Sequence, residues 1–175
     1  MHFERLMSAA HPLYGRAMEL YRVSFPPHER REALSQERIL ADADYHFALA
    51  CDGDTFVGFA LFWETDGFVY VEHLCIVPEL RGRRYGGQGL ELLGQRGRGV
   101  ILEIDPPVDD ISRRRQGFYE RSGFVVNPYP HVHPPYHAGC AGHGLVVMSS
   151  PRAISAEEYA AFSDYLAGRV MKGAY

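Results

Sequence analysis

Apolar and polar positions follow two different periods along this chain, and the two periods separate strands from helices. Alternating or continuous apolar runs predict strands at 3–6, 45–51, 55–62, 68–77, 100–104, from Phe124 and at 145–148. Apolar residues spaced three or four apart predict helices at 12–24, 29–41, around Leu90, from Arg113 and from Ser155. Hairpin strands come first and strand–helix–strand units follow, which indicates a mixed α/β fold.

Turn chemistry supports these boundaries. Asp52-Gly53 and Asp66-Gly67 are typical of hairpin turns, and Pro26-Pro27 ends the first helix. Ser155 with Glu158 forms a capping-box pattern at the last helix. The Pro- and His-rich segment 127–144 is predicted to be a loop. No repeat or linker divides the chain, so we expect one domain over residues 1–175.

Composition narrows the classes of function. A chain of 175 residues with a net charge of −4 does not favour a nucleic-acid binder, because its arginines cluster locally and do not coat a face. Three scattered cysteines make no disulfide framework, which favours a reducing, cytoplasmic location. There is no apolar run of roughly 18 residues, so we expect no membrane span.

Segment 70–93 carries the strongest functional signal. A strand ends before Pro78, a turn rich in Gly and Arg follows, and a helix pattern begins. Such a turn offers free backbone N–H groups and a positive helix end to a phosphate. The nucleotide-triphosphate loop is excluded because the only lysine is Lys172, and the G-x-G-x-x-G dinucleotide pattern does not occur in the turn. Taken alone, this turn is also compatible with a solvent-exposed basic loop that connects the strand to the helix and binds no phosphate.

A second segment, 113–126, comes downstream with a strand between the two. It reads as a helix that ends in Phe118-Tyr119, followed by Gly123 as a helix stop and a strand start at Phe124. Two ordered motifs are far more specific than either motif alone.

Together the two segments resemble the coenzyme motifs of the GNAT N-acetyltransferases. Arg81 and Gly86 match the ends of the pattern Q/R-x-x-G-x-G/A, and 118–124 matches a helix ending in Phe-Tyr-x-x-x-Gly-Phe. Arg84 stands where the family has its middle glycine, and a positive φ would cost energy there. Segments 24–31, 70–73 and 133–136 look like one bacterial subgroup of unassigned substrate. The resemblance implies a central mixed, mostly antiparallel sheet with helices on both faces.

The resemblance also implies acetyl-CoA as co-substrate. In the family a splayed central strand binds the thioester and pantetheine, and the following turn binds the pyrophosphate. The residues that would bind the coenzyme are Leu74, Cys75, Ile76, Arg81, Gly82, Arg83, Arg84, Tyr85, Gly86, Gly87, Ser112 and Arg115. Of these, Ser112 stands where many members carry an Asn that contacts pantetheine.

Acetyl transfer to an amine needs a proton acceptor and an acid for the departing thiolate. Glu72 is expected on the same strand face as Leu74, with its pKa raised by burial, which suits a base. Glu103 is the rival carboxylate, and a third possibility is that no residue acts as base. His73 is expected on the opposite face as a packed residue. Tyr119 matches the family's thiolate-protonating tyrosine, and its alternative is a core aromatic at a helix end.

The acceptor is expected to be a small-molecule or peptide amine, with its identity and the acyl chain left open, in a monomer or homodimer. Its pocket would be formed by Phe25, Glu29, Arg30, Tyr70, Glu103 and Tyr136. His131, His133, His137, Cys140 and His143 could ligate zinc, but their spacing fits no common zinc module, so no metal is expected.

Two classes of function stay open from the sequence. One is an active N-acetyltransferase, and the other is a catalytically silent module of the same fold that binds a coenzyme A ester or a metabolite for regulation. Both classes need the coenzyme-binding turn, but only the enzyme needs a catalytic base and acid. The presence of both Glu72 and Tyr119 therefore favours the enzyme. A metal-binding stress protein is a distant third.

Overall fold

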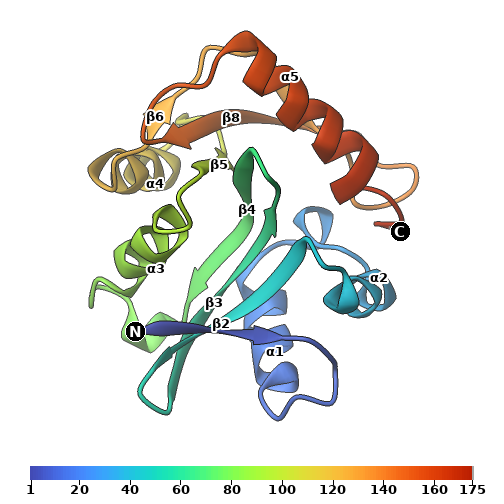
Figure 1. Ribbon diagram of the computed structural model, residues 1–175, viewed down its shortest axis with the longest axis vertical. Coiled ribbons are helices and arrows are strands. Elements are labelled where there is room, and N and C mark those ends of the chain that lie inside the picture. Colours follow the sequence, from blue (N-terminus) through green and yellow to red (C-terminus); the bar gives the residue numbers. More distant parts are fainter. Residues whose placement is uncertain (175) are drawn as a thin grey trace.

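A computed structural model describes residues 1–174 and shows one sheet with helices on both of its faces (Figure 1). In chain order the elements are β1 (His2–Leu6), α1 (Tyr14–Ser24), α2 (Ala33–Arg38), β2 (Tyr45–Asp52), β3 (Thr55–Glu64), β4 (Phe68–Ile76), α3 (Tyr85–Gly94), β5 (Gly99–Ile104), α4 (Asp110–Arg121), β6 (Val125–Val126), β7 (His131–His133), β8 (His143–Ser150) and α5 (Ala156–Tyr165). Short 3-10 turns lie at Pro27–Glu29, Ile39–Ala41 and Pro78–Leu80, and a π turn follows α5 at Leu166–Val170.

The sheet has the strand order β1-β2-β3-β4-β5-β8-β6, with β7 paired to β8 off this path. Every pair is antiparallel except β4 with β5, which are parallel and connected through α3. This mixed, mostly antiparallel sheet confirms the predicted fold class.

The parallel pair separates halfway along its length. β4 pairs with β5 only from Phe68 to Val71, opposite Gly99–Leu102. Beyond this point β4 stays bonded to β3, and β5 stays bonded to β8. The backbone edge of residues 72–76 that would face β5 is therefore open, because no strand replaces the lost partner.

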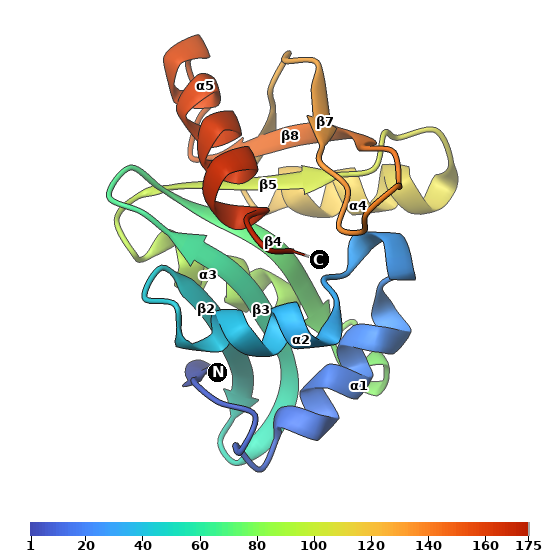
Figure 2. The same ribbon diagram turned by 90° about the vertical axis from the view of Figure 1, so that its right-hand side faces the viewer.

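Two hydrophobic cores lie on opposite faces of the sheet. One contains Ala17, Leu20 and Phe162 and lies under α1, α2 and α5. The other contains Leu90 and Leu93 and lies under α3 and α4. Figure 2 shows α1, α2 and α5 on one side of the sheet and α3 behind it. We call these the α1/α2/α5 face and the α3/α4 face.

A β-bulge at Glu72 breaks the alternation of side chains along β4. Leu61 of β3 pairs with His73 and Phe62 pairs with Val71, which leaves Glu72 as the extra residue. Glu72 and His73 therefore both project toward the α1/α2/α5 face, whereas Leu74 packs against α3 on the other side. The prediction that Glu72 shares a face with Leu74, and that His73 lies opposite, is wrong for this reason.

Several predicted boundaries also change. The helix predicted at 29–41 is α2 flanked by 3-10 turns, because extended residues at Arg30 and Glu32 interrupt it. The segment 127–144 contains β7, which the sequence did not predict. Among residues 1–174, no helix has the length and apolar character needed to cross a membrane.

Candidate active site

The separation of β4 from β5 opens into a cavity of about 1170 Å³ that reaches both faces of the sheet. Its walls include the open half of β4, the turn before α3, the C-terminal end of α4, and the segments around Phe25 and Tyr136. The fold thus brings together the two coenzyme motifs and the Pro- and His-rich segment that the sequence singled out.

The turn before α3 presents unpaired backbone amides to this cavity. Leu80 N–H and Arg81 N–H bond within the 3-10 turn, and Gln88 N–H bonds back to Arg84. Within residues 1–174, the amides of 82–87 have no acceptor. Arg84 adopts φ +66° as the residue that precedes the helix, which is the left-handed conformation that a glycine would take more cheaply.

The two glycines in the first turn of α3 have different surroundings. A Cβ on Gly86 would lie 3.1 Å from the Phe118 ring, so this glycine allows α3 to pack against α4. A Cβ on Gly87 would meet nothing within 4 Å, although Gly87 lines the cavity. Only Gly87 therefore leaves space that a ligand can use.

Tyr119 lies near the C-terminal end of α4 and lines the cavity. Its ring contacts Phe118 and Phe124 at centroid distances of 5.1 and 5.8 Å. Burial raises the pKa of the Tyr119 phenol to about 12, against a smaller opposite effect of Arg115. The phenol therefore keeps its proton throughout the neutral range.

Ser112 does not line the cavity. Its hydroxyl accepts a hydrogen bond from Asp109 N–H at 3.1 Å, while Ser112 N–H donates to Asp109 Oδ1 at 2.7 Å. This capping box fixes the start of α4 and leaves the side chain buried. The structure gives the Ser112 hydroxyl a role in the helix start, and its pantetheine contact stays a prediction.

Glu72 is enclosed by three donors on the α1/α2/α5 face. Its Oε1 accepts from Arg31 Nε at 3.2 Å and from the Tyr136 hydroxyl at 2.8 Å, and its Oε2 accepts from Trp63 Nε1 at 3.0 Å. Burial is the largest single effect and raises the pKa of Glu72, but the Arg31 guanidinium, His73 and the hydrogen bonds from Trp63 and Tyr136 together outweigh it, and the net pKa is lowered. The expected rise in pKa is therefore wrong, and the carboxylate is a poor proton acceptor.

Glu103 is the second buried carboxylate and lies one residue beyond the last β4–β5 pair. The Tyr70 hydroxyl donates to its Oε2, and His131 Nε2 contacts its Oε1. His133 Nε2 lies 4.0 Å from Oε2. Glu103 and His133 line the cavity, so β7 places histidines beside the point where the strands diverge.

His73 fills the space between α1 and the segment around Tyr136. Its Nε2 donates to the Glu29 carbonyl at 2.8 Å, and its Nδ1 is buried without a partner among the described residues. Burial lowers the pKa of His73 to about 4, so the ring is neutral near pH 7.

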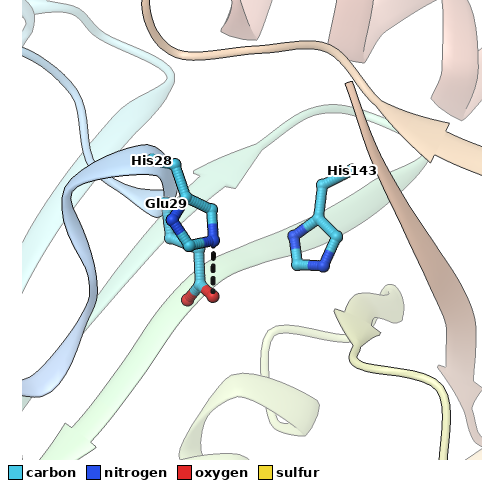
Figure 3. A group of neighbouring side chains, drawn as sticks. All are labelled: His28, Glu29 and His143. Carbon is cyan, nitrogen blue, oxygen red and sulfur yellow. Dashed lines mark ion pairs between the residues drawn. The ribbon is translucent and has the colours of Figure 1, made fainter. Parts of the chain in front are cut away.

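A group at the cavity wall offers the geometry closest to a metal site. One ligand atom each from His28, Glu29 and His143 lies within 4.8 Å of the others. Figure 3 shows the His28 ring paired with the Glu29 carboxylate and the His143 ring to one side of this pair. His143 is also 3.5 Å from Asp105, which pairs with Arg115 at 2.5 Å. Burial, reinforced by Asp105, raises the pKa of Glu29.

Most of the predicted site residues meet at this one cavity. Those that line it are Glu72, Tyr119, Leu74, Cys75, Ile76, Arg81, Gly82, Arg84, Tyr85, Gly86, Gly87, Arg115, Phe25, Glu29, Tyr70, Glu103 and Tyr136. Arg30, Arg83 and Ser112 do not line it. Sequence reasoning missed Arg31 as the partner of Glu72. It considered His133 as a possible zinc ligand in the Pro- and His-rich loop and not as a neighbour of Glu103.

Comparison with known proteins gives the family. The model of the acetyltransferase (GNAT) family matches residues 10–124. A protein of Bacteroides thetaiotaomicron, assigned to the GNAT acetyltransferases, has 30% sequence identity and a TM-score of 0.91, over 99% of each chain. The chain belongs to the GNAT acetyltransferase family.

Two further relatives differ in how much they share. An aminoglycoside 6'-N-acetyltransferase complexed with coenzyme A has a TM-score of 0.60 at 16% identity, over 88% of this chain and 100% of that one, which shows the fold alone. The Bacillus subtilis (strain 168) protein YjbC, named as an acetyltransferase, is 30% identical over 66 residues, or 37% of this chain. The matched part spans about a third (34%) of YjbC.

Proposed function

We propose that this protein transfers the acetyl group of acetyl-CoA directly to the amine of a small-molecule or peptide acceptor. The observation that carries the proposal is the open edge of β4 beside a turn of unpaired amides, both in one cavity. Family membership and the coenzyme A named with similar structures support it. Three free cysteines support a reducing, cytoplasmic setting.

The residues present fit acetyl-CoA as a substrate. The amides of 82–87 and the N-terminus of α3 would bind the pyrophosphate, with Arg81 and Arg84 adding charge. The open backbone edge at 74–76 would hold the pantetheine amides and place the thioester where the strands diverge. The Tyr119 phenol would then give its proton to the departing thiolate.

Glu72 takes a different role in this proposal from the one that the sequence suggested. Its ion pair with Arg31 and its contact with Tyr136 fix β4 on the α1/α2/α5 face, where the acceptor would bind. We therefore assign Glu72 as a positioning residue. A silent regulatory module is the weaker alternative, because binding alone needs neither a protonated tyrosine nor buried titratable groups at the strand separation.

The test compares two glycines that lie in helices and have open space around them. Gly87→Val should weaken acetyl-CoA binding at least tenfold, because the new side chain fills the space in front of the backbone amides of 82–87. Thiol release should fall with the affinity. Gly15→Val in α1 is the matched control, because a Cβ there also meets nothing within 4 Å and the residue is outside the cavity. Affinity is read from the rise in Tm with acetyl-CoA.

The same assay separates the two functions. Thiol release with any amine of a panel supports the transferase. A rise in Tm without turnover on any amine would support the silent module, and an unchanged affinity in the Gly87 variant would place the phosphates elsewhere.

A further inference from the structure

Two buried side chains on the α1/α2/α5 face oppose each other without bonding. His133 is 5% exposed, and its Nε2 lies 4.0 Å from Oε2 of Glu103, which is too long for a hydrogen bond. Within residues 1–174, His133 Nε2 has no hydrogen-bond partner. A buried polar atom without a partner is costly, which points to a donor supplied by a ligand.

The partner of His133 Nδ1 determines which ring nitrogen of His133 carries the hydrogen. His133 Nδ1 lies 2.6 Å from the Pro134 carbonyl oxygen, which can only accept, so Nδ1 carries the hydrogen. In the neutral ring, Nε2 therefore has a free lone pair. The ring is set up to accept a hydrogen bond, and then a proton, at Nε2.

The neighbouring carboxylate is already shared with another histidine. Tyr159 donates its proton to the Pro130 carbonyl at 2.9 Å, so its oxygen accepts from His131 Nδ1–H at 3.0 Å. The contact between His131 Nε2 and Glu103 Oε1 then requires one more proton between them. Glu103 and His131 together therefore carry no net charge. Oε2 accepts from the Tyr70 hydroxyl and keeps a second lone pair for another donor.

We propose that Glu103 Oε2 and His133 Nε2 together hold the amino nitrogen of the acceptor, and that His133 is the catalytic base. A nitrogen about 2.8 Å from each atom would make two hydrogen bonds at an angle of roughly 90°, given their separation. The inference rests on the proposed function, because the thioester has to lie at the strand separation next to Glu103.

The reaction balances with these groups. The acceptor R–NH₃⁺ gives one proton to His133 Nε2, and the neutral amine attacks the thioester carbon. A C–N bond forms, the C–S bond breaks, and the second amine proton reaches the thiolate through Tyr119, which gives its own proton and regains one. His133 then releases its proton to water.

The electrostatics of this pocket favour the neutral amine over its ammonium form. The Glu103–His131 pair and the His73 ring are neutral, and the Glu72 and Asp105 carboxylates of the same cavity are paired with Arg31 and Arg115. Burial raises the pKa of Glu29, the remaining carboxyl group described at the cavity wall, and burial also penalises an isolated positive charge. The ammonium would therefore lose its proton more readily here than in water.

The experiment uses His133→Asn, which keeps a donor near the Pro134 carbonyl and removes Nε2. With acetyl-CoA and the primary amines 2-phenylethylamine and 1,4-diaminobutane, kcat should fall about 10²–10⁴-fold and the acidic limb of the pH–rate profile should disappear. The rise in Tm with acetyl-CoA should not change. His46→Asn is the matched control, because His46 also lies beside a carboxylate, 3.5 Å from Glu64, but outside the cavity.

A kcat within threefold of wild type and an unchanged pH profile in His133→Asn would overturn the proposal. If wild-type protein releases no thiol with either amine, the proposed function fails for these two acceptors. The site is then still tested by ¹⁵N-histidine NMR. His133 should show the Nδ1–H tautomer, and 2-phenylethylamine should shift its Nε2 resonance. An Nε2–H tautomer, or no shift at saturating amine, would refute the site even if His133→Asn does not fold.

Discussion

The Tyr119 phenol lies among aromatic rings at the end of α4 and lines the cavity. With a pKa raised to about 12 by burial, it keeps its proton throughout the neutral range. A thiol has a lower pKa, about 8.5, so the proton moves to the departing sulfur only as the C–S bond breaks and an amine proton replaces it on Tyr119.

Tyr119→Phe should therefore lower kcat by about 10–100-fold and leave acetyl-CoA affinity unchanged, because ring packing is kept. Single-turnover thiol release measures the chemical step. Tyr129→Phe is the control, since that hydroxyl bonds the Ile154 carbonyl at 2.9 Å outside the cavity. An unchanged single-turnover rate in Tyr119→Phe would make this residue part of the core only.

At the scale of elements, the start of α4 is held by side chains that bond to their own helix. The Asp109–Ser112 capping box resembles the Ser155–Glu158 box of α5, so the two helices begin in the same way. Both boxes satisfy backbone N–H groups that would otherwise have no partner.

Ser112→Ala should lower the free energy of unfolding by about 0.5–1 kcal/mol and leave acetyl-CoA affinity unchanged. Urea denaturation and the rise in Tm measure the two effects. Ser155→Ala should show a similar loss of about 1 kcal/mol. A large loss of affinity in Ser112→Ala alone would support the pantetheine contact that the sequence suggested.

Local patterns predicted most elements because they depend on neighbours in sequence. The Asp52-Gly53 hairpin and the Ser155 capping box form as predicted. The bulge at Glu72 could not be predicted, since it depends on pairing with β3 and has no turn residue to mark it. The partners of Glu72 come from positions 9, 41 and 64 residues away, so no local pattern indicates its lowered pKa.

At the scale of the whole molecule, Arg31 connects distant parts of the chain. Its guanidinium pairs with Glu72 on β4, donates to the Val170 carbonyl after α5, and lies 5.6 Å from the Trp63 ring centroid. Both charged side chains are at most 1% exposed. Removing one charge would therefore leave the other buried and unpaired.

The protein should lose stability in acid through this pair. Because the folded pKa of Glu72 is lowered, the unfolded chain binds the proton more readily, so the contribution is present above about pH 4.5 and is lost as pH falls toward the folded pKa. Glu72→Gln should cost about 3 kcal/mol near pH 7 and flatten the Tm curve below about pH 4.5.

Thermal unfolding from pH 7 to 3 measures this effect. Glu157→Gln is the control, because Glu157 is an exposed carboxylate and its removal should leave most of the acid sensitivity intact. If Tm of Glu72→Gln falls with decreasing pH as steeply as Tm of wild type, the Glu72–Arg31 pair is not the source of the acid sensitivity.

The extra residue in β4 determines what a deletion in this strand would do. Val71 and His73 already lie on opposite faces, so removing Glu72 would restore simple alternation without moving any other side chain to a new face. His73 and Cys75 would stay on the α1/α2/α5 face, and Leu74 would still pack against α3. The bulge therefore adds one carboxylate to the α1/α2/α5 face without disturbing the side-chain pattern of the open edge beyond it.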